Sequence, residues 1–109
     1  MDALAGLPEP VMMDTHDVQG APLSQWVYRC ANNYGISVLL GERPPHMQYA
    51  SRRDCLYEVG IARFTGPGPD DWELSTLAGV TDGWPDRTVT GRRTLGQVQE
   101  IYRLVKAHG

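Results

Sequence analysis

Residues 94–109 read TLGQVQEIYRLVKAHG, and this stretch predicts an amphipathic helix. Thr94 and Gln97 match the capping box, in which a hydroxyl and an amide three residues later satisfy backbone N–H groups at the start of a helix. A single helix of this length is marginal in water, so its apolar side must cover an apolar surface. At roughly 3.6 residues per turn, the apolar positions form one stripe about 120° wide, with Leu104 outside it: Leu95, Val98, Ile101, Tyr102 and Val105.

The segment 25–40 predicts two antiparallel strands joined by a short turn. If the loop is residues 33–35, with Gly35 in the left-handed conformation, both apolar sets share one face of the sheet and Cys30 lies opposite Val38. The apolar side chains occupy alternate positions on both sides of the turn: Trp26, Tyr28, Cys30, Ile36, Val38 and Leu40.

The remaining pattern predicts two further strands and long connections. Residues 54–64 are apolar on both faces, as in a central strand, and permit a sheet-mediated homodimer. The Gly-, Pro- and Asp-rich residues 65–71 predict a turn before a short strand at 72–75. Residues 41–53 and 76–93 show little periodicity and are expected to be loops. The expected fold is α+β, a mainly antiparallel sheet of about four strands with the C-terminal helix across one face.

Composition indicates one globular domain with an acidic extension. The chain has 109 residues, of which 41% are apolar and 21% charged, which is typical of a globular protein. Residues 1–24 contain four acidic side chains and neither Lys nor Arg, and they lack a regular period. We therefore expect an extended acidic arm over 1–24, docked through its apolar residues 11–13, and a single domain over 25–109.

The charge and the cysteine content indicate a cytoplasmic protein. The net charge of −3 is too small to mark a nucleic-acid-binding protein. No apolar run approaches the ~20 residues of a membrane span, and the first residues lack the basic start and apolar block of a signal peptide. Cys30 and Cys55 are expected to be buried thiols rather than a disulfide.

No group of residues predicts catalysis, a cofactor or a bound metal. Asp14, His16 and Asp17 are metal-ligand types, but they lie in the arm without a scaffold, so a solvated polar turn is the favoured interpretation. A thiol nucleophile would need Cys30 or Cys55 to be exposed beside an imidazole, whereas both fall on predicted core faces. The candidate bases are His16, His46 and His108.

Aromatic and acidic residues in loops predict a protein-binding surface. Trp and Tyr are frequent at binding hot spots, and exposed Asp side chains could contact arginines of a partner. Trp84 could instead fold back and close one end of the core. The predicted partner-binding residues are Asp14, Asp17, Met47, Tyr49, Asp70, Asp71, Asp82 and Trp84. The alternative is a small nucleic-acid-binding regulator that uses loop arginines: Arg52, Arg53, Arg92 and Arg93.

Three short motifs carry a resemblance to a known class of proteins. They are NNYGISV at 32–38, LYEVGI at 56–61 and TLGQVQEI at 94–101. Together they resemble small accessory proteins encoded by bacteriophages, which have an Asn-Gly-Tyr-Gly-x-Ser-Val segment. Asn33 stands where that pattern has Gly, and the arm over 1–24 is additional.

The resemblance implies a non-enzymatic phage protein that binds a host protein, as anti-CRISPR proteins do. The hypothesis is an inhibitor that occludes the surface of a bacterial defence complex such as CRISPR–Cas, in the host bacterial cytosol. The step from motif to function is an analogy, and no catalytic residue is transferred.

Overall fold

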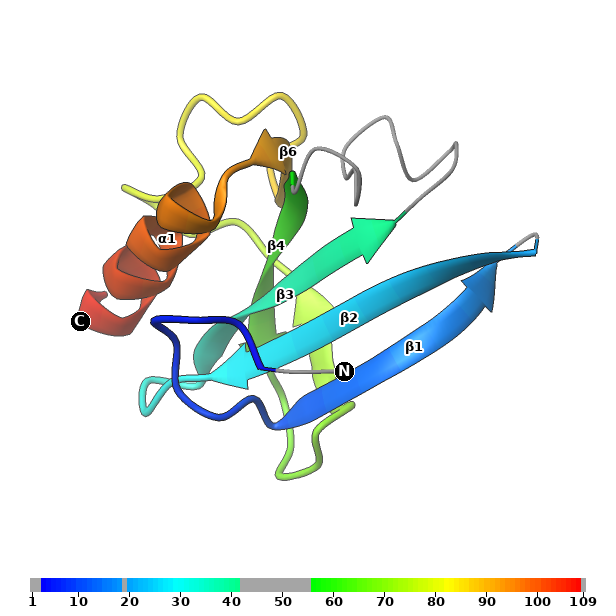
Figure 1. Ribbon diagram of the computed structural model, residues 1–109. Helices are drawn as coiled ribbons and strands as arrows, with labels where there is room; N and C mark the ends of the chain where they lie inside the picture. The colour runs from blue at the N-terminus through cyan, green and yellow to red at the C-terminus, as the bar shows by residue number, and fades with distance from the viewer. Residues whose placement is uncertain (1–2, 19, 42–55, 109) are drawn as a thin grey trace.

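The computed structural model describes residues 3–18, 20–41 and 56–108, which form one six-stranded sheet and one helix (Figure 1). Every pairing between the described strands is antiparallel, in the order β1-β2-β3-β4-β5, and β6 pairs with β4 beside β5. The elements are β1 (Met12–Val18), β2 (Ala21–Arg29), β3 (Tyr34–Gly41), β4 (Tyr57–Phe64), β5 (Trp72–Leu74), β6 (Val89–Arg93) and α1 (Leu95–Ala107).

The predicted α+β class and C-terminal helix are confirmed, but four strands were too few. The two additional strands are β1, in the segment expected to be an arm, and β6, in the segment expected to be a loop. The β6 strand contains Gly91 and an irregular register against β4, where Arg92 adopts a positive φ of 54°. A bulge of this kind breaks the period of 2 by which a strand is recognised.

The turn between β2 and β3 has the predicted length but lies two residues earlier. Cys30 donates its backbone N–H to Tyr34 O over 2.7 Å, so the loop is 31–33, and Asn33 takes the positive φ of 66°. Tyr28 therefore pairs with Ile36, and the prediction that Cys30 lies opposite Val38 was wrong. The predicted common face is nevertheless correct, because the shift preserves the alternation of side chains.

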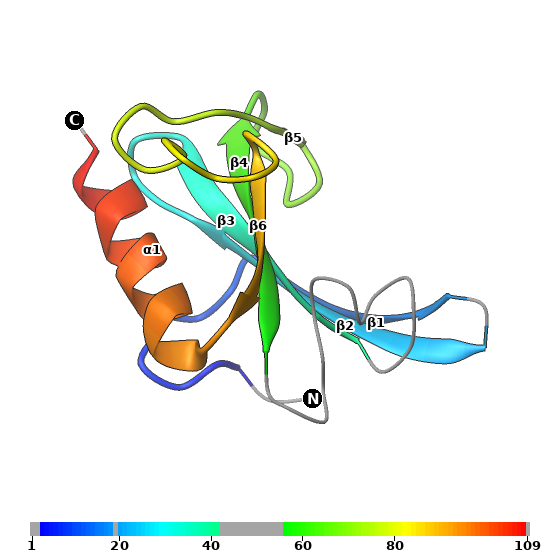
Figure 2. The same ribbon diagram turned by 90° about the horizontal axis from the view of Figure 1, so that it is seen from above.

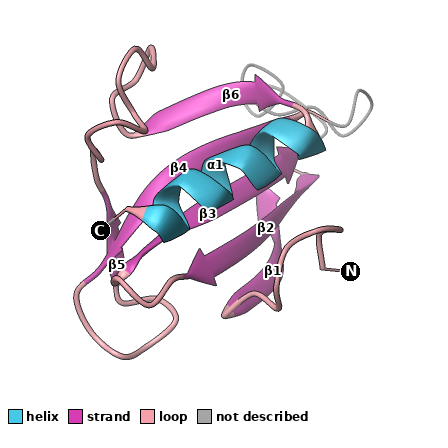
Figure 3. Ribbon diagram, turned by 90° about the vertical axis from the view of Figure 1, so that its left-hand side faces the viewer, coloured by secondary structure: helices cyan, strands magenta, loops and turns pink. Residues whose placement is uncertain are grey.

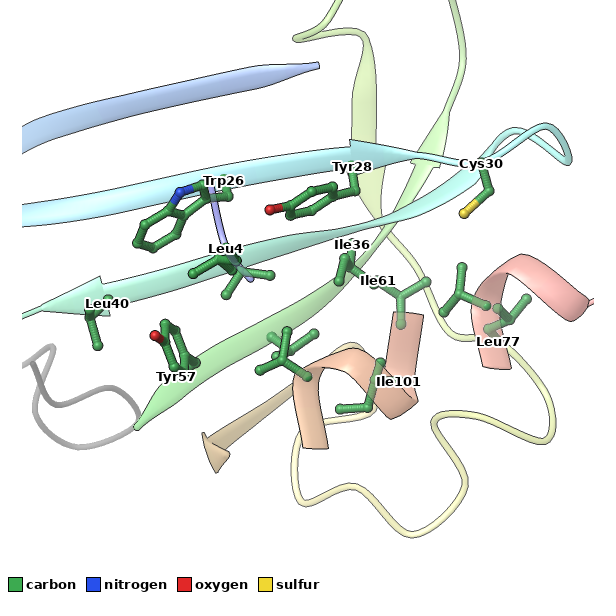
Figure 4. Close-up of a cluster of buried hydrophobic side chains, with 14 residues drawn as sticks. Leu4, Trp26, Tyr28, Cys30, Ile36, Leu40, Tyr57, Ile61, Leu77 and Ile101 are labelled. Carbon is green, nitrogen blue, oxygen red and sulfur yellow. The ribbon is translucent and has the colours of Figure 1, made fainter. Parts of the chain in front are cut away.

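Helix α1 covers one face of β3 and β4 (Figure 3). Thr94 and Gln97 form the predicted capping box, and the exposed Leu104 lies outside the buried stripe. Figure 4 shows the core between α1 and the sheet, where Trp26 and Tyr57 meet edge to face. The most deeply buried members of this core are Tyr28, Ile36, Val38, Val59, Ile61, Val98 and Val105.

The N-terminal segment closes the core beside α1. Leu4 is buried among the core side chains, and Gln99 Nε2 donates to Ala5 O over 2.7 Å (Figure 4). The buried Tyr28 hydroxyl forms no hydrogen bond of normal geometry to a described residue. Burial raises the pKa of Tyr28, and the nearby Leu4 backbone partly offsets that rise. Leu4, rather than residues 11–13 alone, therefore anchors this segment.

A second, smaller cluster lies on the face of the sheet that α1 leaves uncovered. Val27, Ala62 and Phe64 are buried there, and Met12 of β1 and Trp72 of β5 pack against them. The Arg29 guanidinium lies 4.6 Å from the centre of the Phe64 ring, and its Nη1 donates to Gly66 O. β4 is therefore apolar on both faces, as the sequence predicts.

Candidate functional site

The β1–β2 hairpin extends away from α1 and the body of the sheet (Figure 2). β1 pairs with β2 along its whole length, from Met12 opposite Val27 to Val18 opposite Ala21. Among the described strands, β1 ends the order of the sheet, so no described strand pairs with its outer edge. Such an edge presents backbone N–H and C=O groups that can pair with another chain.

The faces of β1 follow from its register with β2. Met13 lies opposite the buried Trp26, so Met13, Thr15 and Asp17 are on the face that α1 covers elsewhere in the sheet. Asp14 and His16 are on the opposite face. Asp14 and Asp17 are both exposed, and neither forms an ion pair with another described residue.

His16 belongs to a row of polar side chains that crosses three strands. Gln25 Nε2 donates to Ser37 Oγ over 3.0 Å, and Gln25 Oε1 lies 2.8 Å from His16 Nε2. With this amide orientation, His16 Nε2 donates the hydrogen. The predicted cluster at 14–17 is thus a stretch of β-strand in which His16 has a structural hydrogen bond. Within the described ranges, no three His, Cys, Asp or Glu residues are grouped as a metal site.

An open groove of about 500 Å³ lies at the start of β1. Val11 and Met13 are 43% and 41% exposed there, which is high for large apolar side chains. The hydrogen bond from Gln99 to Ala5 O holds the N-terminal side of the groove to α1. Its lining is mostly apolar: Ala3, Leu7, Pro8, Glu9, Pro10, Val11, Met12 and Met13.

Trp84 and Asp82 lie in the connection between β5 and β6, which forms a second open pocket of about 480 Å³. Trp84 is half-buried and packs against the main core, so it partly closes the core as the alternative interpretation proposes. Asp82 Oδ2 accepts a hydrogen bond from the Gly79 N–H over 3.1 Å, so its carboxylate stabilises the local turn. Arg87 and Thr76 complete the rim of this pocket.

Asp70 and Asp71 lie in the turn between β4 and β5, which Figure 1 places away from both the hairpin tip and the β5–β6 connection. The Asp71 carboxylate accepts a hydrogen bond from Gly68 N over 2.8 Å, so Asp71 shapes the turn. Asp70 is exposed. The described partner-binding candidates therefore lie on three different segments rather than in one cluster, and the β4–β5 turn approaches Val11 at the start of β1.

Several predicted residues lie outside the described ranges. They are Met47, Tyr49, Arg52 and Arg53, together with His46, Asp54 and Cys55. Of the other two candidate arginines, Arg92 is exposed at the β6 bulge, and Arg93 donates from both Nε and Nη2 to Thr90 Oγ1. The Arg93 guanidinium is thus already bound within the protein.

Of the two candidate thiols, the one that the structure describes, Cys30, is buried. Cys30 lies in the main core, where burial raises its pKa and a hydrogen bond with Tyr102 partly offsets the rise. A raised pKa disfavours the reactive thiolate. His108 lies beside the Tyr34 ring, with 5.9 Å between the ring centres.

Sequence reasoning missed a pair of carboxylates that the β4–β6 pairing brings near one another. Glu58 of β4 and Asp86, which precedes β6, line a pocket of about 210 Å³ with Pro85 and Val89. Burial, and then the negative charge of Asp86, raise the pKa of Glu58. Asp86 also accepts hydrogen bonds from Thr88. The two residues are far apart in the sequence, so no local motif could have identified the pair.

Glu58→Gln is expected to stabilise the protein at neutral pH. Because the folded-state pKa of Glu58 exceeds its ordinary value of 4.5, ionisation disfavours the folded state, and this cost appears as the pH rises through that raised pKa. Urea unfolding should show a gain for the variant at about pH 7 that disappears near about pH 4. Glu100→Gln, at an exposed site on α1, should show no such gain. A gain from Glu58→Gln that is larger in acid would contradict the direction of the pKa shift.

Comparison with family models, with curated proteins and with solved structures finds no match to this chain. Among the described residues, no helix has the length and hydropathy needed to cross a bilayer. Function is therefore inferred from the geometry of the described residues.

Proposed function

We propose that the protein binds another protein through the β1–β2 hairpin and acts by occupying a surface of that partner. The observation that carries this proposal is the outer edge of β1, which no described strand pairs and which presents exposed Asp14 and Asp17. An open edge supplies backbone hydrogen bonds, and the carboxylates select a basic partner.

The carboxylates favour arginine on the partner. An Arg guanidinium can bind a carboxylate through two parallel hydrogen bonds, and such charge-assisted bonds are shorter and stronger than neutral ones. Asp14 and Asp17 make no ion pair within the described protein, and Asp14 Oδ1 accepts a hydrogen bond from the Thr15 N–H over 2.8 Å, so a basic partner would displace no described cation but would compete with that local bond. The hairpin also stands clear of α1 (Figure 2).

The sequence resemblance suggests the class of partner. A phage-encoded protein of this kind would act in the bacterial cytosol on a defence complex such as CRISPR–Cas. Nucleases of such complexes hold nucleic acid with Arg and Lys, and an acidic hairpin complements surfaces of that charge. Occlusion of such a surface would inhibit the complex without any catalytic step.

Reversal of both hairpin charges tests the proposal. The tagged wild type should recover a stoichiometric protein from bacterial lysate, identified by mass spectrometry, and Asp14→Lys/Asp17→Lys should recover at least about tenfold less. Each lost charged hydrogen bond is worth about 1.5–3 kcal/mol, and about 1.4 kcal/mol corresponds to a factor of ten.

The matched control is Asp70→Lys, an exposed aspartate on the β4–β5 turn. It adds positive charge on the turn whose residues 67–69 line a pocket with Val11, at the opposite end of β1 from Asp17, and it should leave recovery unchanged. All three proteins should be compared by their urea unfolding midpoints, so that loss of fold is not read as loss of binding. Equal recovery of the partner by the double variant and by the wild type would contradict the proposal that the hairpin is the binding surface.

A further inference from the structure

We infer that the partner contributes a short extended segment that adds to the outer edge of β1 as an antiparallel strand, with the residue order basic-x-x-basic-apolar-apolar. This inference rests on the proposed function, because it names the chemistry of the segment that the same hairpin would bind. It uses three features together: the outer edge of β1, which no described strand pairs, the places of the two carboxylates along β1, and the apolar groove where β1 starts.

The antiparallel direction follows from the sheet. All pairings between described strands are antiparallel, and antiparallel pairs are slightly more stable per residue than parallel ones. A segment added to β1 would then run from the hairpin tip towards the groove. Its first residues meet the acidic end of β1, and its last residues meet the apolar end.

The spacing of the basic residues follows from the spacing of the carboxylates. Asp14 and Asp17 are three residues apart, so they lie on opposite faces of the sheet. In an antiparallel pair, a first residue opposite Asp17 places the fourth residue opposite Asp14. Directly opposed side chains have Cβ atoms about 4.5–5.5 Å apart, so Lys or Arg at these two positions can reach the carboxylates. Each face of the new strand thus carries one ion pair.

The apolar positions follow in the same way. The fifth residue lies opposite Met13, whose side chain is 41% exposed, and the sixth lies opposite Met12. These two side chains point to opposite faces of the sheet, and the groove lined by Leu7, Pro8 and Val11 provides apolar surface beside this end of β1. The second and third residues lie opposite His16 and Thr15, and their side chains are left unspecified.

The charge of β1 argues against a second copy of this chain as the occupant. β1 contains two aspartates and neither Lys nor Arg. If the β1 strands of two copies paired, the pair would contain four carboxylates close together, and like charges at neighbouring positions are destabilising. A partner strand that contains Lys or Arg can form the same backbone hydrogen bonds with the edge of β1, and its positive charges attract the two aspartates instead of repelling them.

The first test uses a synthetic peptide, acetyl-Lys-Thr-Thr-Lys-Val-Val-amide, titrated into the full ¹⁵N-labelled chain. The backbone amide signals of Met12–Val18 should shift on binding. A peptide of reversed order, Val-Val-Lys-Thr-Thr-Lys, has the same composition and net charge. When antiparallel it can still place its two Lys opposite Asp17 and Asp14, but it then places no Val opposite Met13 or Met12. It should bind about two- to thirtyfold more weakly, because each of the two lost apolar pairs contributes about 0.2–1 kcal/mol. Equal affinity for the two peptides, or shifts confined to other strands, would overturn the inference.

Charge exchange tests the register. A peptide with Glu at its first position should bind Asp17→Lys about two- to fivefold better than Asp14→Lys, and one with Glu at its fourth position should show the reverse preference. No preference, or the opposite one, would overturn the register.

The two proposals can fail separately. If β1 charge reversal abolishes recovery of a partner protein but the forward peptide binds no better than the reversed one, the hairpin binds a partner without strand addition. If recovery is insensitive to β1 charge, the proposed function itself fails.

Discussion

Gly35→Ala is expected to cost at least about 3 kcal/mol of unfolding free energy, or to prevent folding altogether, because a side chain at this position meets backbone. A Cβ built on Gly35 lies 1.8 Å from Tyr28 O and 3.1 Å from Arg29 Cα. Neither atom can move without displacing β2 from β3, where Arg29 pairs with Gly35. Urea or guanidinium unfolding followed by far-UV circular dichroism would measure the loss.

Gly96→Ala is the matched control for this prediction. Gly96 is also a glycine within a regular element, but the nearest atom to its Cβ is Thr94 Oγ1 at 3.9 Å, so there is space for a methyl group. Alanine inside a helix is favoured over glycine by roughly 0.5–1 kcal/mol, and the variant should be stabilised by about that amount. If both variants had the stability of the wild type, the close approach of β2 and β3 would be contradicted.

Ile101→Ala is expected to lower the unfolding free energy by about 2–5 kcal/mol. Ile101 belongs to the core between α1 and the sheet, where Val98 and Val105 are fully buried on the same side of the helix (Figure 4). Truncation removes apolar contacts and leaves a cavity that the neighbouring strands cannot fill without moving. Equilibrium denaturation would measure the change.

Leu104→Ala provides the comparison on the same helix. Leu104 is 44% exposed, so its truncation should change stability by less than about 0.5 kcal/mol. The helix propensities of the two changes are similar, so the difference between them reports burial. A cost for Leu104→Ala as large as that for Ile101→Ala would mean that α1 presents a different face to the sheet.

The helix was predictable because its signals are local. The capping box at Thr94 and the period of the apolar stripe fall within one segment, and the structure confirms both. The shared face of β2 and β3 was predictable for a similar reason, since alternation fixes which side chains point inwards. The loop position was not predictable, because either Asn33 or Gly35 can adopt a positive φ; in the structure Asn33 does so, and Gly35 lies within β3 where a Cβ would meet Tyr28 O.

β1 was missed because an edge strand on a projecting hairpin has little burial to impose alternation. Most of its side chains are exposed on both faces, so Asp14, Thr15 and Asp17 interrupt the apolar pattern without cost. Asp14 and Asp17 could still be named as candidate contacts from the sequence, because charged side chains in an acidic segment are expected to be exposed. Their role in binding stays a prediction, as do those of Asp70, Asp82 and Trp84.

The contacts between the first residues and α1 determine when the core can form during translation. Leu4 and Ile101 belong to the same core, Gln99 Nε2 donates to Ala5 O, and Asn32 Nδ2 donates to Val105 O and His108 O. A nascent chain on the ribosome would therefore display one bare apolar face of its sheet until translation has passed α1. Emergence of α1 from the ribosome, rather than emergence of the strands, is the event that completes this core and ends the period in which a chaperone would be needed.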